Sequence, residues 1–207
     1  MRIRVSLARS LRHLLAFTPL IVLARALPAQ RPVPDAVLTS GSLSFTGHAT
    51  VGDFVGLTNN VTGAIIGGRD YSVTRGWVEA PARTLVTGND HRDSDLRASM
   101  EVSRYPMIRF DLSGATPVGP APARPDSMSM MLHGALSIHG VTRNVDLPAM
   151  MHRSADKTYL TARFPLSLAD YEIGRLTKMF GLLRMQNEIE VRVDLVFVDT
   201  PTLWATP

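Results

Sequence analysis

The chain has 207 residues, enough for one domain with its own core, and 45% of them are hydrophobic while 19% are charged. This composition is that of a folded globular domain and excludes a disordered or low-complexity chain. The formal net charge is +4, but five of the 22 Lys and Arg residues are arginines within the first 29 positions, which hold no acidic residue. Beyond them, 17 basic residues stand against 18 acidic ones, a net charge of −1, so we expect no nucleic acid partner.

The first 29 residues follow the plan of a secretory signal peptide. Several arginines precede the apolar run LLAFTPLIVL, and small residues follow in ARALPAQ, where we expect cleavage between Ala26 and Gln30. The apolar run is about ten residues long, whereas a membrane span needs about 20, so no stable transmembrane anchor is expected. The sequence therefore predicts an exported bacterial protein, periplasmic or secreted, and the absence of cysteine excludes disulfides and a lipoprotein anchor.

After a Pro-rich leader at 30–36, most of the chain alternates between apolar and polar residues, which is the pattern of strands with one buried face. The clearest case is EIEVRVDLVFV at 188–198, where Ile189, Val191 and Val193 share one face with the apolar residues that follow. Eight segments carry this pattern, around residues 37–48, 53–66, 72–87, 106–114, 127–138, 141–152, 157–168 and 188–198.

One segment breaks the alternation and predicts a short helix near 90–101. Asn89 or Asp90 can serve as the N-cap, and acidic residues follow in the first turn. Leu96 and Met100 lie four residues apart on one face, and Pro106 stops the segment.

Many strands with a single helix predict an all-β, mainly antiparallel fold, either a sandwich or a closed barrel of about eight strands. We assign the barrel domain to 37–199 and a C-terminal tail to 200–207. The inward faces are rich in Met, Phe, Leu and Ile, as either a dry core or a lipid pocket requires. Alternation alone does not separate those two.

Four motifs, in order and spacing, resemble the YceI-like family of exported bacterial lipid-binding proteins. They are SFTGHATVGDFVGLTNNVTGAI, TGNDHRDSDLR followed by YPMIRFD, LHGALSIHGVTRNVDLPA, and FPLSLADYEIG. The resemblance covers roughly Asp35 to Val198, and Asp95 stands where the family usually has a histidine. It implies an elongated lipocalin-like antiparallel barrel whose lumen holds a long-chain isoprenoid, such as a quinone or a polyprenyl lipid.

Candidate site residues follow from the inward faces together with the lumen that the resemblance implies, because aromatic and aliphatic side chains supply apolar contact area. The lumen candidates are Phe45, Phe54, Met100, Tyr105, Ile108, Phe110, Leu136, Ile138, Phe164 and Tyr171. The candidates for contact with a polar head group are His48, Asp93 and Arg109. Apart from bound lipid, no cofactor is expected.

His133 and His139, six residues apart, suggest a metal site as an alternative. No carboxylate or cysteine lies at a recognised metal-ligand spacing from them. His139-Gly140 is better interpreted as the turn of a β-hairpin, and the acidic residues after Gly88 as helix-capping residues rather than a calcium loop. No catalytic residues are predicted, since the hydrolase, nucleotide-binding and zincin motifs do not occur.

The leading hypothesis is therefore a non-enzymatic carrier or store of a long-chain isoprenoid lipid, monomeric or homodimeric. Two alternatives remain open: a ligand-free structural or interaction module of the envelope stress response, and an isoprenoid-modifying enzyme that uses Asp93 with a histidine.

Overall fold

The computed structural model describes residues 34–50, 52–67, 71–119, 127–174, 177–178 and 183–200. The predicted signal peptide and most of the predicted leader and tail lie outside these ranges. The described strands, in chain order, are β1 (Ala36–Ala49), β2 (Gly52–Thr58), β3 (Thr62–Ile66), β4 (Arg75–Pro81), β5 (Met107–Pro117), β6 (Ser127–Ile138), β7 (Val141–Ser154), β8 (Lys157–Ser167), β9 (Thr177–Lys178) and β10 (Leu183–Asp199). The described helices are η1 (Ala82–Thr84), α1 (Asp90–Ser99) and η2 (Leu168–Tyr171), of which η1 and η2 are short 3-10 helices.

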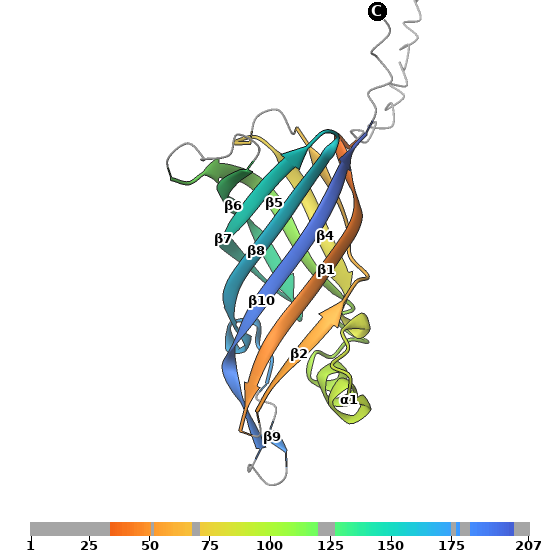
Figure 1. Cartoon of the computed structure of the whole chain (residues 1–207). Helices are drawn as coiled ribbons and strands as arrows, with labels where there is room; N and C mark the ends of the chain where they lie inside the picture. Colours follow the sequence, from red (N-terminus) through yellow and green to blue (C-terminus); the bar gives the residue numbers. More distant parts are fainter. Residues whose placement is uncertain are drawn as a thin grey trace, which may run out of the picture. The chain divides into compact units, whose positions relative to one another are not determined.

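Eight of these strands close into one antiparallel barrel. Hydrogen-bonded neighbours follow the ring β1-β3-β4-β5-β6-β7-β8-β10, and β10 returns to pair with β1 from Ala36–Asp199 to Ala49–Met185. Figure 1 shows β1 and β10 side by side, with the strands running obliquely around the barrel. The prediction of an all-β barrel of about eight strands with one helix near 90–101 is confirmed.

Period-two alternation decides which side chains face the barrel interior. Along β6 every second side chain is buried, including Met130, Leu132, Leu136 and Ile138. Strand β8 follows the same rule, with Ala162, Phe164 and Leu166 inside. Burying one face of each strand against the other strands of the ring forms the core that stabilises the barrel.

Two predicted strands are interrupted. The single strand predicted at 53–66 is broken between β2 and β3, where the Thr58 hydroxyl accepts a hydrogen bond from the backbone N–H of Asn60 at 3.1 Å. The strand predicted at 72–87 ends at Pro81, and the backbone N–H of Ala82 donates instead to the Pro106 carbonyl at 2.8 Å. At the first break a local side chain satisfies the backbone, and at the second a distant carbonyl does, so period-two alternation continues in the sequence where the ladder does not.

Helix α1 begins at the predicted place, and Asn89 is its N-cap, since its side chain accepts from the backbone N–H of Arg92 at 3.0 Å. The helix and η1 lie beside β2, where a strand of the ring would otherwise continue (Figure 1). Leu85 and Met100, 3% and 6% exposed, belong to the main core, so this segment completes the barrel wall with side chains.

Candidate functional site

The barrel encloses one apolar cavity of about 180 Å³ among the described residues. Every strand of the ring contributes to its lining, and the η1–α1 segment adds Leu85, Leu96 and Met100. Apart from the Trp77 indole, the polar side chains in the lining belong to Glu79 and Ser99. The interior is therefore a hollow apolar space and not a completely filled core.

The cavity is far larger than the space that one water molecule needs, so a ligand with many carbon atoms fits inside it.

Most of the predicted lumen residues line this cavity. Those that do so are Phe45, Met100, Ile108, Phe110, Leu136, Ile138 and Phe164. They come from β1, β5, β6, β8 and the end of α1, and the alternating pattern turns each strand residue inward.

The remaining three lumen candidates lie outside the lining. Phe54 packs edge-on against Phe45 at 6.0 Å and is covered by the Arg92 guanidinium, 4.6 Å from its ring centroid. Tyr105 packs edge-on against His139 at 4.8 Å. Tyr171 is 3% exposed, and burial raises the pKa of its phenol. These aromatic residues support the wall rather than face the cavity.

Two of the three polar head-group candidates also lie away from the cavity. His48 Nδ1 is 2.8 Å from Asp53 Oδ1, and both side chains are exposed. Arg109 sits between the inward-facing Ile108 and Phe110, and therefore points outward.

On the outer face, Arg109 forms ion pairs of 2.7 Å with both Glu79 and Asp111, and its guanidinium lies 5.1 Å from the Trp77 ring centroid. The hydrogen bonds that Arg109 donates to Asp111 are the main reason that the pKa of Arg109 is raised. The alternation of β5 already carried the signal that this arginine faces outward.

Asp93, the third polar candidate, is a buried structural anchor. It is 5% exposed, and its Oδ1 accepts from the backbone N–H of Thr87 at 2.7 Å and from the Thr87 hydroxyl at 2.6 Å. The hydrogen bond from the Thr87 hydroxyl is the largest cause of its lowered pKa. A carboxylate held ionised and fully hydrogen-bonded is poorly suited to proton transfer near neutral pH.

The two histidines of the β6–β7 hairpin serve different local contacts. His133 Nδ1 contacts Asp146 at 2.7 Å and its Nε2 contacts the Thr116 hydroxyl at 2.9 Å. His139 and Gly140, with φ values of 52° and 79°, form the two-residue turn, as the sequence predicts. Among the described residues, no three His, Asp or Glu side chains gather as metal ligands would.

Sequence reasoning missed many of the lining residues, among them Leu85, Ile173 and Met185. Leu85 lies just after η1, in the segment predicted as continuous strand, and Ile173 follows η2. Met185 lies near the start of β10, ahead of the stretch where alternation is clear. The sequence pattern gives no indication of Leu85 or Ile173, because the chain at these positions is neither strand nor α-helix.

Within the part of the chain that the structure describes, no helix combines the length and apolar character needed to span a bilayer.

An eight-stranded antiparallel barrel with an apolar lumen and a helix beside its wall defines a protein of the lipocalin-like class. The sequence model of the YceI-like domain matches residues 37–197, and the chain therefore belongs to the YceI-like family. No curated protein matches the sequence.

Solved structures agree with the fold. A polyisoprenoid-binding domain from Saccharophagus degradans, implicated in plant cell wall breakdown, aligns with a TM-score of 0.65 and 16% identity, over 81% of this chain and 100% of that one. BcnA from Burkholderia cenocepacia aligns with a TM-score of 0.62 and 12% identity, over 75% of this chain and 95% of that one. A YceI protein from Campylobacter jejuni gives 0.53 and 15%, over 69% and 82%. At these identities the likeness concerns the fold.

Proposed function

We propose that this protein binds a long-chain isoprenoid lipid of the quinone or polyprenyl type in the barrel lumen, and carries or stores it without chemical change. The single observation that carries the proposal is the hollow apolar cavity of about 180 Å³, lined from every strand of the ring. The Saccharophagus degradans domain of the same fold, described as polyisoprenoid-binding, supports this class of ligand.

The energetics favour such a ligand. Burial gains about 0.8 kcal/mol per CH₂, so a chain with about 12 to 15 buried carbons gains roughly 10 to 12 kcal/mol. At the low end of association costs, about 4 kcal/mol, the remainder corresponds to dissociation constants around the micromolar range. The lining offers little to hold a polar ligand, which favours a hydrocarbon chain over other small molecules.

A carrier role fits the lining better than catalysis does. Glu79 is the titratable side chain among the lining residues, and its carboxylate is held by Arg109 at 2.7 Å on the outer face. Asp93, the candidate for an isoprenoid-modifying enzyme, is tied to Thr87. With the export signal expected at the N-terminus, the proposed setting is the bacterial periplasm or the medium.

The test is native mass spectrometry of protein purified without detergent, followed by organic extraction. We expect a bound mass that extraction recovers as an isoprenoid, or uptake of added geranylgeraniol by the apo protein. If neither occurs, the proposal fails and a ligand-free module of the envelope becomes the better explanation.

A further inference from the structure

Among the described residues, the backbone hydrogen bonding of the barrel wall is sparse at a seam between β2 and the segment from Ala82 to Met100. On one edge, β2 pairs with β1 continuously from Leu43–Thr58 to Ala49–Gly52. On the other edge, its backbone pairing in the described structure is a single bridge between Leu57 and Val86. That bridge has two hydrogen bonds, of 2.9 Å and 3.0 Å.

Side-chain contacts complete the seam. The Thr58 and Thr84 hydroxyls lie 2.7 Å apart, and the Arg92 guanidinium covers the Phe54 ring at 4.6 Å. Leu85, between Thr84 and the exposed Val86, lines the cavity, so the segment separates solvent from the lumen at this point.

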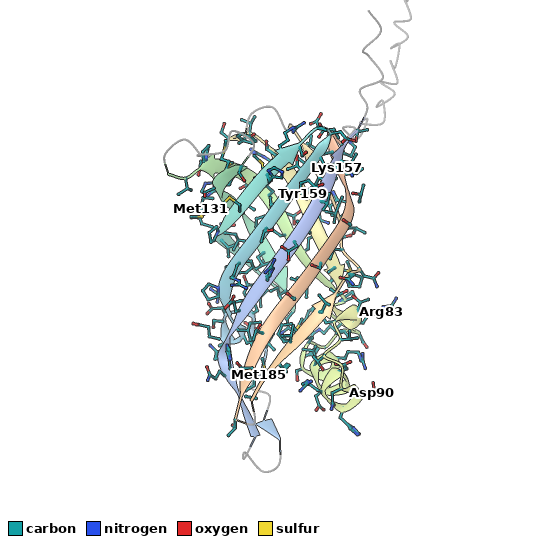
Figure 2. All side chains as sticks on the ribbon, in the orientation of Figure 1. Arg83, Asp90, Met131, Lys157, Tyr159 and Met185 are labelled. Atoms are coloured by element: carbon teal, nitrogen blue, oxygen red, sulfur yellow. The ribbon has the colours of Figure 1, made fainter. Side chains whose placement is uncertain are left out.

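The solvent-facing side of the seam carries apolar side chains. Val55, Leu57 and Val86 are 53%, 39% and 50% exposed, and Leu57 is the bridge partner of Val86. Three exposed aliphatic side chains in one place mark a site of apolar contact. Arg83 and Asp90 project to solvent from the same segment (Figure 2), so polar side chains border this patch.

We propose that this seam is the portal through which the apolar chain of the ligand passes into the lumen. The inference rests on the proposed lipid binding and adds the route. Apolar side chains lie on both sides of the seam, so a hydrocarbon chain crossing here exchanges one apolar contact for another.

In the described structure, the backbone hydrogen bonds opposing separation are the two of the Leu57–Val86 bridge, whereas parting β6 from β7 breaks a ladder that runs from Ser127–His152 to Ile138–Val141. The segment also moves as one piece. Asp93 accepts hydrogen bonds from both the backbone N–H and the hydroxyl of Thr87, and Arg92 Nε donates to the same hydroxyl at 2.8 Å. These bonds tie Thr87, next to the bridge residue Val86, to α1, so α1 and Val86 would swing away from β2 together.

A disulfide across the bridge tests the portal. Leu57 and Val86 exchange both backbone hydrogen bonds, which places their Cα atoms about 5.5 Å apart, within the range that a disulfide spans. The chain has no cysteine, so the variant Leu57→Cys/Val86→Cys contains only the engineered pair. A matched control, Ser137→Cys/Thr142→Cys, links β6 to β7, which a continuous ladder already joins and where the two hydroxyls are 2.8 Å apart.

Uptake is followed by stopped-flow fluorescence with NBD-labelled geranylgeraniol delivered from phosphatidylcholine vesicles. We expect the oxidised Leu57–Val86 variant to take up the probe at least tenfold more slowly than its reduced form, with the same final amplitude. The control pair should show equal rates in both redox states.

Two results overturn the proposal in distinguishable ways. Equal uptake rates in the oxidised and reduced portal variant mean that the chain passes elsewhere, while lipid binding stands. No uptake by the wild type or any variant removes the proposed function and the portal with it.

Hydrogen exchange supplies a check that needs no substitution. The amides of Leu57 and Val86 should exchange faster than that of Phe45 in the β1–β2 ladder, and slower exchange at the bridge contradicts the portal.

Discussion

Asp93 and Thr87 form a two-point contact, in which one carboxylate oxygen accepts from both the backbone N–H at 2.7 Å and the hydroxyl at 2.6 Å. The contact joins the first turns of α1 to the loop that carries Val86. It therefore holds the covering segment of the barrel in shape, and it explains why a buried acid is present without a catalytic partner.

The variant Asp93→Ala should unfold more easily, by about 1.5 to 3 kcal/mol at pH 7, because hydrogen bonds to a buried charged group are lost. Urea unfolding measures this difference. As a matched control, Asp90→Ala in the same helix, with an exposed side chain, should cost less than about 1 kcal/mol. Equal losses in the two variants would contradict the anchoring role.

The same contact predicts a pH dependence. The folded-state pKa of Asp93 is lowered below that of an aspartate in the unfolded chain, so the folded state binds fewer protons at this group than the unfolded chain does. Its contribution is fully present above the unfolded pKa and disappears as pH falls through the folded pKa. The stability gap between wild type and Asp93→Asn should hold from pH 7 to about 5 and shrink below about 4. A gap that widens on acidification would refute this assignment.

Filling the cavity should abolish binding without unfolding the barrel. Ala162 is 4% exposed and lines the cavity, so Ala162→Phe places a ring where the ligand chain is proposed to lie. We expect at least a tenfold loss of affinity for geranylgeraniol by fluorescence titration, with thermal unfolding retained. The neighbouring Arg163 is exposed on the outer face, and Arg163→Phe should bind as the wild type does. Loss of affinity in both variants would indicate a general effect on folding.

Cavity capacity predicts how affinity depends on chain length. Affinity should rise steeply with each isoprene unit while the chain still fits the lumen, as from geraniol to farnesol. Once the lumen is filled, each added unit should contribute much less, because it lies outside the enclosed volume. Isothermal titration across a series of prenols measures the increments. A uniform increase through chains of eight or more units would show that the lumen expands on binding.

Gly134 marks a close approach within the wall. A Cβ built there would lie 2.4 Å from the Asp111 carbonyl oxygen and 2.6 Å from the Phe110 ring, so Gly134→Ala should destabilise the fold by about 1 to 3 kcal/mol. At Gly174 nothing lies within 4 Å of such a Cβ, and Gly174→Ala should be nearly neutral. Thermal denaturation of the two variants distinguishes them, and equal stability would show that β5 and β6 shift apart freely.

Much of the fold was predictable because period two is a local property. Ile189 and Val191 were placed on one face from spacing alone and are buried, and Asn89 was named as a candidate cap from its chemistry. The same pattern identified six of the seven candidates that line the cavity, since an inward face becomes a lumen wall once the ring closes, and Met100 came from helical spacing.

The rest required the tertiary structure. Phe54 and Tyr105 are aromatic and well placed in sequence, yet each packs edge-on against another ring, Phe45 on the paired strand β1 and His139 in the β6–β7 turn. The break at Pro81 depends on the Pro106 carbonyl, which no local pattern reports.

The sequence by itself determined the strands, their inward faces, the helix and the family resemblance, because each depends on residue identity and short-range spacing. Only the tertiary structure decided that β1 closes on β10, that the interior is hollow, and that the wall between Leu57 and Val86 depends on one bridge. The physical reason is that closure, cavity volume and gaps in a ladder arise from long-range contacts and from the summed packing of side chains, and alternation along one strand carries neither.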